Sequence, residues 1–209
     1  MDVHKNSIAR FSCYRDVLSR FKSYNVSWIY SGQIASAVGT TAAQVRKDFS
    51  LFKVAGKRKS GYEIDTLIDA INRIIGKNKK TNAILVYANE SLGNALYDGY
   101  FSQDPTIHIA ARFTATPSIP VQSENEKFSP VYPVTSLVGY ITEHAIRYGI
   151  IAIPDASAQK IIDMMIIAGI KGLLCITAAE LKSPKNCTVR SINPLRELEA
   201  VMYFTKHHS

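Results

Sequence analysis

The sequence predicts an α/β protein that starts with a winged helix-turn-helix domain, continues with a Rossmann-like parallel-sheet domain and ends with a helix. Two short helical patterns joined by a glycine precede residue 51, and apolar runs alternate with helical patterns after residue 80. The excess positive charge lies in the first part. Of the net charge of +8, residues 1–80 hold 15 Lys and Arg against 6 Asp and Glu, whereas residues 81–209 hold 10 against 11. We therefore expect domains at 1–79 and 80–192, followed by a helix at 193–209.

The N-terminal domain is expected to start with an amphipathic helix over 7–24. Apolar residues recur there at helical spacing, and Ser7 is a suitable cap. A second amphipathic pattern covers 63–75 and gives the last helix of the domain. The polar segment 76–80 that follows is interpreted as the linker.

Between these two helices the pattern is typical of a helix-turn-helix. A short helix is predicted from a cap at Ser31 to Gly39, which turns the chain. Its expected inward side is Ile34, Ala37 and Val38.

The next helix, predicted over 40–50, carries polar groups that suit DNA. Thr40 or Thr41 can cap it, and Val45 and Phe49 face inward. Gln pairs bidentately with adenine and Arg with guanine, and Lys holds phosphate oxygens. By itself this helix is equally compatible with a solvated surface, but the preceding helix and the basic hairpin tip at 57–59 favour a DNA-reading helix with a wing. The residues expected to contact DNA are Thr41, Gln44, Arg46, Lys47, Ser50, Lys57, Arg58, Lys59 and Tyr62.

The C-terminal part has the alternating strands and helices of a parallel sheet. Helices are expected over 92–100 and 158–166. The predicted strands lie at 83–87, 107–113, 148–154 and 172–176.

The turn after the first of these strands departs from the dinucleotide-binding pattern G-x-G-x-x-G. Its three positions hold Ala88, Glu90 and Gly93, so the glycine for helix packing is kept. Glu90 brings bulk and negative charge to a place where a pyrophosphate needs bare backbone. At the end of the second strand, Thr114 stands where a carboxylate normally accepts the ribose hydroxyls. A Rossmann domain with a lost or altered nucleotide site is therefore favoured.

The sequence gives little indication of a metal site, a catalytic site or a membrane segment. Cys13, Cys175 and Cys187 are far apart and show no metal-ligand spacing. The five histidines fall in no catalytic pattern, so the chain is not expected to be an enzyme. No apolar run approaches membrane-spanning length and no signal peptide is recognisable, so we expect a cytoplasmic protein.

The two parts together resemble the Rex family of bacterial NAD(H)-sensing repressors, over nearly the whole chain. The resemblance implies a homodimer that exchanges its C-terminal helices and binds a palindromic operator, with NADH releasing DNA and NAD+ permitting binding. The segments that carry it are Ala43–Asp48, Gly61-Tyr62, Pro130–Pro133, Ile153-Pro154, Ala158-Gln159, Ala168–Gly172 and the tail Leu195–Phe204.

The resemblance also implies a cofactor site and an interdomain switch. The family pattern has Gly, Gly and Asp at positions 88, 90 and 114, and we expect NAD(H) sensing to be weakened or lost here. The switch residues implied are Arg10, Tyr100 and Asn193, where Asn193 replaces an aspartate. The implied cofactor-binding positions are Ala88, Asn89, Glu90, Ser91, Leu92, Gly93, Thr114 and Pro154.

Two alternatives remain open at this point. The Rossmann part also resembles the CoA-binding domains of acyl-CoA ligases, which would make the effector an acyl-CoA or another nucleotide. An NAD-dependent oxidoreductase is a weaker alternative, because no proton-handling residue is evident.

The final helix is expected to start at Pro194 with Asn193 as its cap, and to bury its apolar face in a partner subunit.

Overall fold

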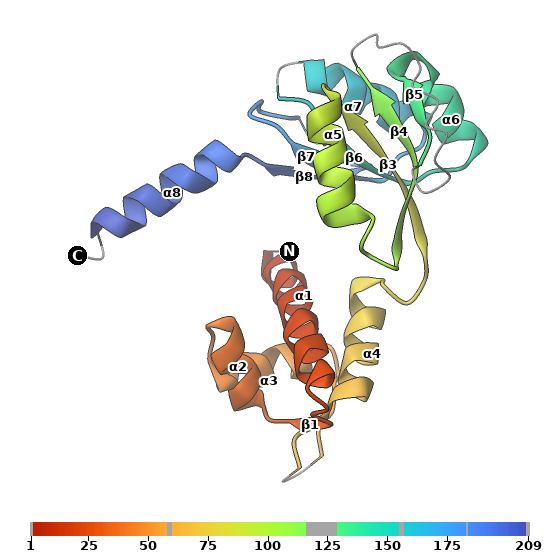
Figure 1. Ribbon diagram of the computed structural model, residues 1–209. Helices are drawn as coiled ribbons and strands as arrows, with labels where there is room; N and C mark the ends of the chain where they lie inside the picture. Colours follow the sequence, from red (N-terminus) through yellow and green to blue (C-terminus); the bar gives the residue numbers. More distant parts are fainter. Residues whose placement is uncertain (1, 58–59, 116–128, 155–156, 183, 208–209) are drawn as a thin grey trace. The chain divides into compact units, whose positions relative to one another are not determined.

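The computed structural model describes residues 2–57, 60–115, 129–154, 157–182 and 184–207. It divides into two units, Met1–Lys79 and Lys80–Ser209. Figure 1 shows a helical N-terminal unit and a C-terminal unit built on a sheet. This confirms the predicted fold class. Each unit is described separately below.

The N-terminal unit is a winged helix-turn-helix domain. Its core is formed by residues from all four helices together with Ile29, and includes the fully buried Phe11, Tyr14 and Phe49. The strands form a two-stranded antiparallel ladder that pairs Trp28 with Glu63. In chain order, the elements are α1 (Asp2–Ser23), β1 (Trp28–Ile29), α2 (Ser31–Val38), α3 (Ala42–Leu51), β2 (Tyr62–Glu63) and α4 (Ile64–Ile75).

A side-chain cap explains where α3 starts, and a glycine explains where α2 ends. The Thr41 hydroxyl accepts a hydrogen bond from the Gln44 backbone N–H at 3.1 Å, which confirms Thr41 as the cap of α3. Gly39 ends α2 with a φ of 69°, a left-handed conformation that glycine adopts without strain.

Three details of the predicted helices were wrong. Ser7 does not cap α1, because the helix starts five residues earlier and Ser7 is buried within it. Ser31 is the first residue of α2, whose cap position is Tyr30; there the side-chain carbonyl of Gln33 accepts from the Tyr30 N–H. Ala35, rather than Ala37, is the buried alanine of α2.

The C-terminal unit is a six-stranded parallel sheet in the order β5-β4-β3-β6-β7-β8. This order reverses between β3 and β6, as in the doubly wound folds whose ligands bind beyond the carboxyl ends of the strands at that point. The strands are β3 (Thr81–Tyr87), β4 (Ile107–Thr114), β5 (Val131–Pro133), β6 (Tyr148–Ala152), β7 (Gly172–Ile176) and β8 (Thr188–Ile192).

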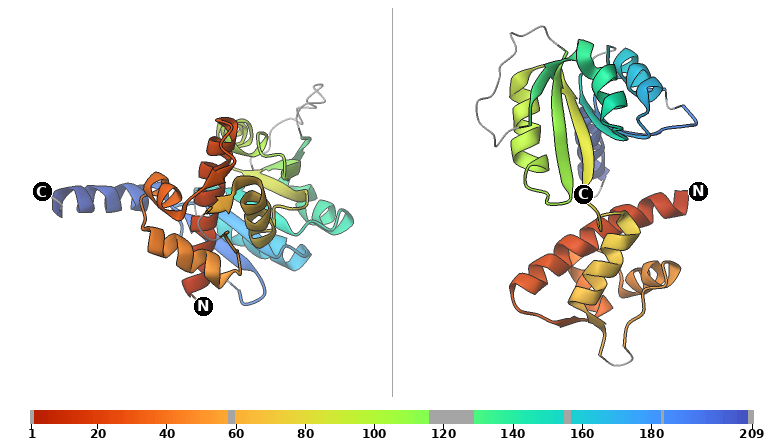
Figure 2. Two further views of the ribbon diagram at one scale, coloured as in Figure 1. Left: turned by 90° about the horizontal axis from the view of Figure 1, so that it is seen from below. Right: turned by 90° about the vertical axis from the view of Figure 1, so that its right-hand side faces the viewer.

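Helices cover both faces of this sheet (Figure 2). Helix α5 (Glu90–Leu96), with the π-helical turn Tyr97–Phe101 that follows it, packs on the face that carries Leu85 and Tyr87. Helices α6 (Leu137–Glu143) and α7 (Ser157–Ala168) pack on the opposite face against Val86 and Phe113. A 3-10 turn, Val134–Ser136, precedes α6.

Sequence patterns missed β5 and β8, and gave no bounds for α6. Strand β5 and helix α6 have only three and seven residues, which is too short for a periodic signal. Strand β8 lies at the sheet edge, and four of its five residues are exposed, so it lacks an apolar run.

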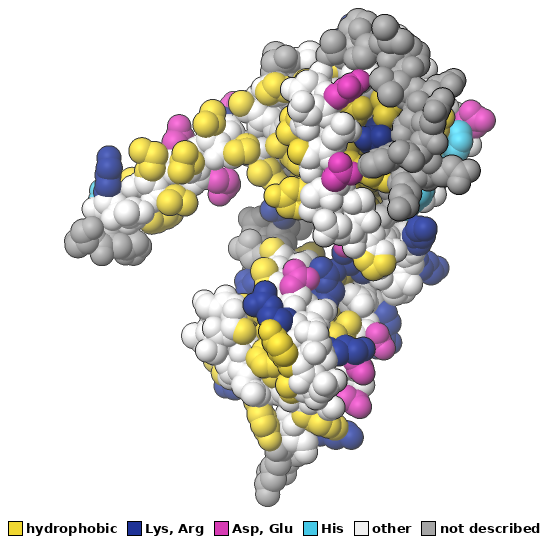
Figure 3. Space-filling model, viewed as in Figure 1, with side chains coloured by type: hydrophobic (Ala, Val, Ile, Leu, Met, Phe, Trp, Pro, Cys, Tyr) yellow, Lys and Arg dark blue, Asp and Glu magenta, His cyan; other side chains and the backbone are white. Residues whose placement is uncertain are grey.

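Helix α8 (Pro194–His207) ends the described chain and buries none of its residues. The side chain of Asn193 accepts from the Leu195 N–H at 3.1 Å, which confirms the predicted cap and the place of Pro194 in the first turn. Figure 3 shows apolar side chains along this helix. Leu195, Leu198, Val201, Met202, Tyr203 and Phe204 are each more than half exposed.

Replacing Gly93 by Ala is expected to destabilise the C-terminal unit by about 1–3 kcal/mol. A Cβ at Gly93 would lie 2.5 Å from the ring of Tyr87, which is 1% exposed and has no room to move. The matched control is Gly99→Ala, because a Cβ there meets nothing within 4 Å. Thermal unfolding of both variants measures the difference. Equal stability of the two would contradict close packing of α5 on β3.

Candidate nucleic-acid interface

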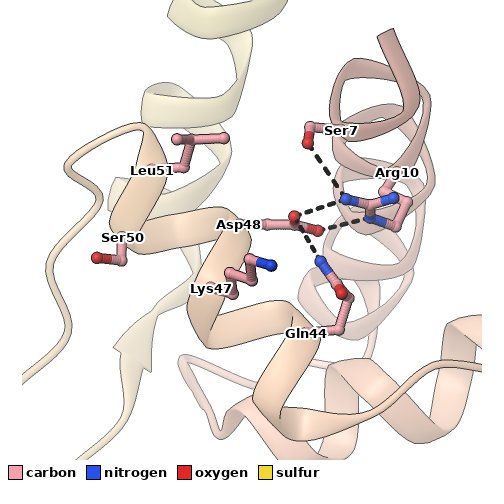
Figure 4. A pocket seen from close by; sticks show the side chains of 7 residues that line it. All are labelled: Ser7, Arg10, Gln44, Lys47, Asp48, Ser50 and Leu51. Carbon is pink, nitrogen blue, oxygen red and sulfur yellow. Dashed lines mark hydrogen bonds and ion pairs between the residues drawn. The ribbon is translucent and has the colours of Figure 1, made fainter. Parts of the chain in front are cut away.

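A buried carboxylate, Asp48, joins α3 to α1 (Figure 4). Asp48 is 2% exposed. Its Oδ2 accepts from Arg10 Nε at 2.6 Å and from the Tyr14 hydroxyl at 2.8 Å, and its Oδ1 accepts from Arg10 Nη2 at 2.7 Å and from Gln44 Nε2 at 2.9 Å. Two elements that are distant in the sequence are therefore held together by the bidentate ion pair with Arg10 and by the Tyr14 hydroxyl, whereas Gln44 donates from α3 itself.

The surroundings of Asp48 keep it ionised. Burial alone would raise the pKa of the Asp48 carboxyl, but the hydrogen bonds from Arg10, Tyr14 and Gln44 outweigh burial and hold that pKa below its ordinary value. Burial and the bond to Asp48 raise the pKa of Tyr14, so its hydroxyl remains a donor. The cluster is a charged acceptor surrounded by donors.

The exposed side of α3 carries Ala43, Arg46, Lys47 and Ser50. Arg46 Nη1 donates to the Ser31 hydroxyl at 3.2 Å, which directs the guanidinium along the N-terminus of α2. Gln44 is only partly exposed and lies at the α1 side of this face, where Asp48 holds its amide. The structure therefore brings Arg46, Lys47 and Ser50 onto one open face and places Gln44 at its edge.

The wing is the segment between α3 and β2, and Lys57 and Gly61 form its base. The two residues exchange backbone hydrogen bonds of 2.8 and 3.1 Å, and Gly61 has a φ of 80°. A Cβ at Gly61 would lie 2.5 Å from the Ile29 carbonyl oxygen, so the turn requires glycine. The Lys57 ammonium lies 4.9 Å from the centroid of the Trp28 ring. Arg58 and Lys59, predicted for the tip of the wing, lie outside the described residues.

Tyr62, predicted to contact DNA, packs within the N-terminal unit. Its ring packs edge-on against Phe49 with centroids 4.9 Å apart, and burial raises the pKa of its hydroxyl. The half-buried ring thus packs against the core of the N-terminal unit.

The turn after β3 departs from the pattern that binds a dinucleotide pyrophosphate. Asn89 caps α5, and its side-chain oxygen accepts from the Leu92 N–H at 2.9 Å. The next residue, Glu90, starts the helix with an exposed carboxylate. Two oxygen acceptors therefore occupy the end of a helix where a phosphate group needs free N–H donors. Only Gly93 keeps its role in a G-x-G-x-x-G turn, since it lets α5 approach the Tyr87 ring.

The remaining predicted positions are spread over several elements. Ala88 and Ser91 flank the Asn89-Glu90 pair, Thr114 is buried at the end of β4, and Pro154 is exposed after β6. Of the three residues predicted for a switch, Tyr100 is 71% exposed, Asn193 caps α8 and Arg10 binds Asp48.

The described residues contain no group of three or more His, Cys, Asp or Glu side chains that could hold a metal ion. Burial raises the pKa of Cys175 to about 11, which keeps this thiol protonated. Across the described ranges no helix is long and apolar enough to cross a membrane.

Comparison with known proteins identifies the family. A family model described as "Putative DNA-binding protein N-terminus" matches residues 2–50, and one described as "CoA binding domain" matches residues 46–179. The protein named redox-sensing transcriptional repressor Rex from Limosilactobacillus reuteri is 32% identical over 207 residues, covering 99% of this chain and 95% of the relative. The Rex of Streptococcus mutans is 31% identical, covering 97% and 94%. This chain belongs to the Rex family.

Solved structures support the same assignment. The crystal structure of RSP in complex with beta-NAD+ and operator DNA has a TM-score of 0.86 at 25% identity, covering 98% of this chain and 93% of that chain. RSP in complex with beta-NADH has a TM-score of 0.81 at 25% identity, covering 97% and 94%. The Rex-family fold therefore extends over both units of this chain.

Sequence reasoning assigned no role to Asp48 or Tyr14 and placed Arg10 in a switch. One signal was present, because position 48 lies between the inward-facing Val45 and Phe49, so a carboxylate there is buried and needs a donor. The identity of that donor was not readable, since Arg10 is 38 residues away in the sequence.

Replacing Arg10 by Ala is expected to cost about 1–3 kcal/mol at pH 7, moderated by solvent because the Arg10 side chain is 32% exposed. The pKa of Asp48 is lower in the folded chain than the unfolded value of about 4, so the stabilisation is complete above that pH and is lost as the pH falls through the folded pKa. The difference between the variant and the parent should therefore shrink in acid, as measured by urea unfolding at several pH values.

The control is Lys22→Ala, which removes an ion pair between two exposed side chains, Lys22 and Asp65. It should change stability little at any pH. A pH-independent loss in Arg10→Ala would show that its partner is not an ionised Asp48.

Proposed function

We propose that this chain is a transcriptional repressor that binds a palindromic operator as a homodimer through α3 and the wing. The observation that carries the proposal is the open face of α3 with Arg46, Lys47 and Ser50. On the inward side of the same helix, Asp48 binds Arg10 of α1 and so holds α3 in place. Arginine and lysine on such a face supply contacts to base edges and to phosphates. The Rex relatives and the operator complex of RSP support the same role.

The charge distribution agrees with this proposal. The whole excess of Lys and Arg over Asp and Glu lies in residues 1–80. Neutralisation of phosphates by Lys and Arg supplies most non-specific DNA affinity. Such a protein acts where DNA is found, and we infer a cytoplasmic location.

The homodimer is inferred from α8. Six large apolar side chains of this helix are more than half exposed within the chain. An apolar surface of this kind is stabilised by burial, and a second copy of the chain offers an isologous surface for it. We infer that α8 packs on the partner subunit, as the family resemblance implies.

Response to NAD(H) is inferred to be weakened. Asn89 and Glu90 place acceptors at the N-terminus of α5, and Thr114 supplies no carboxylate for the ribose. The same two acceptors oppose the pyrophosphate of CoA, so the acyl-CoA alternative gains no support from this turn. An interdomain switch through Arg10, Tyr100 and Asn193 remains a proposal, with an uncharged Asn193 in place of an acid.

Replacing Arg46 by Ala is expected to remove specific operator binding, at a cost of about 1–3 kcal/mol in each half-site, because both subunits of the proposed homodimer lose the contact. Fluorescence anisotropy on a Rex-type palindromic duplex at one fixed salt concentration measures this, with two wild-type chains expected per duplex. Arg73→Ala on α4 is the control, because it removes an equal charge from an exposed site outside α3. If Arg46→Ala binds like its parent, α3 is not the reading helix.

Replacing Glu90 by Gly, together with Ala88→Gly, is expected to raise affinity for NADH. The change removes a carboxylate and side-chain bulk from the N-terminus of α5. The measurement is NADH titration by fluorescence, together with operator binding with no ligand, with NAD+ and with NADH. Ser91→Gly is the control, since it leaves the charge unchanged. Strong reversal of wild-type operator binding by NADH would contradict a weakened sensor.

A further inference from the structure

The amide of Gln44 is held in one orientation by Asp48. Gln44 Nε2 donates to Asp48 Oδ1 at 2.9 Å. An ionised carboxylate only accepts hydrogen bonds, so it selects the orientation with Nε2 inward and excludes the flipped amide, which would place two oxygen acceptors in contact. Gln44 Oε1 and the second N–H of Nε2 are left for other partners.

The group that holds Gln44 is itself held by further hydrogen bonds. Asp48 is almost fully buried and accepts three further bonds, two from Arg10 and one from Tyr14. A rotation of the carboxylate away from Gln44 would break a bidentate ion pair. Because the pKa of Asp48 is held low, the carboxylate also remains an acceptor at neutral pH.

Gln44 lies where DNA would meet α3. It lines a groove of about 490 Å³ between α1 and α3, together with Lys47 and Ser50 of the exposed face (Figure 4). Within the described chain, Oε1 of Gln44 accepts no hydrogen bond. The oxygen is therefore free to accept one from a ligand in this groove.

We propose that Asp48 is a positioning residue that sets base specificity: it holds Gln44 with Oε1 presented as an acceptor for the exocyclic amino group of adenine or cytosine in the major groove. Adenine N6 and cytosine N4 are donors, whereas guanine O6 and thymine O4 are acceptors that an outward oxygen repels. Adenine also offers N7 to the remaining N–H of Nε2, so adenine is the favoured base. This inference rests on the proposed operator binding.

The test is the base preference at each operator position. Wild-type protein selects its operator from randomised duplexes, and its affinity is measured for every single base-pair replacement. One position per half-site should favour adenine or cytosine by about tenfold. Asp48→Asn keeps the shape of the side chain but can donate as well as accept, so the preference at that one position should fall to about twofold.

Gln44→Ala should reduce the base preference at the same operator position, and the double variant Gln44→Ala/Asp48→Asn should reduce that preference no further. Asp65→Asn, the same chemical change at an exposed acid of α4, should leave every position unchanged. If Asp48 had only a structural role, Asp48→Asn would weaken binding to every operator variant by one common factor. That result would overturn the inference. If the wild type selects no operator, the proposed function itself fails.

If Asp48→Asn does not fold, the wild-type protein still provides a test. One of the two Gln44 Nε2 protons should exchange slowly with solvent in ¹⁵N-resolved spectra of the operator complex, because the buried carboxylate protects it. Free exchange of both protons in that complex would overturn the proposal.

Discussion

The exposed face of α3, proposed to contact DNA, depends on one buried charge. Asp48 lies on the inward side of that helix, and its ionised carboxylate is tolerated only because four hydrogen bonds reach it from α1 and α3. The bonds from Arg10 and Tyr14 join α1 to α3, and the bond from Gln44, within α3, holds its amide at the edge of the exposed face. A polar group that costs free energy to bury thus specifies how α3 is held against α1.

A comparable constraint shapes the C-terminal unit, although there it is steric. The Tyr87 ring at the end of β3 is buried against α5, and only a glycine at position 93 lets that helix lie so close. The same turn lacks the other two glycines of a dinucleotide-binding pattern. The side chain of Asn89 accepts a hydrogen bond from the Leu92 N–H at the start of α5. The sheet order of the doubly wound fold is therefore kept while the chemistry at its first turn has changed.

Much of the fold was predictable because its signals are local. The caps at Thr41 and Asn193, the glycine end of α2, and strands β3, β4, β6 and β7 each follow from residues close in the sequence. Predictions failed where the local signal was absent or ambiguous. Ser7 and Ser31 are good caps by residue type. However, α1 begins at Asp2, before Ser7, and α2 begins after Tyr30, whose N–H donates to the side chain of Gln33. Strand β5 and helix α6 are held by the sheet and not by their own periodicity.

By itself the sequence determined the class of the longer, periodic elements, the asymmetry of charge and the altered turn at residues 88–93, since these depend on residue type and short-range spacing. Only the tertiary structure decided which groups meet. Arg10 and Asp48 are 38 residues apart, and nothing in their local patterns selects one for the other. The placement of Gln44 at the edge of the α3 face and of the Tyr62 ring against Phe49 was decided in the same way. Spacing along a helix shows which side a residue takes, but hydrogen-bond partners and ring contacts arise when separate elements pack together.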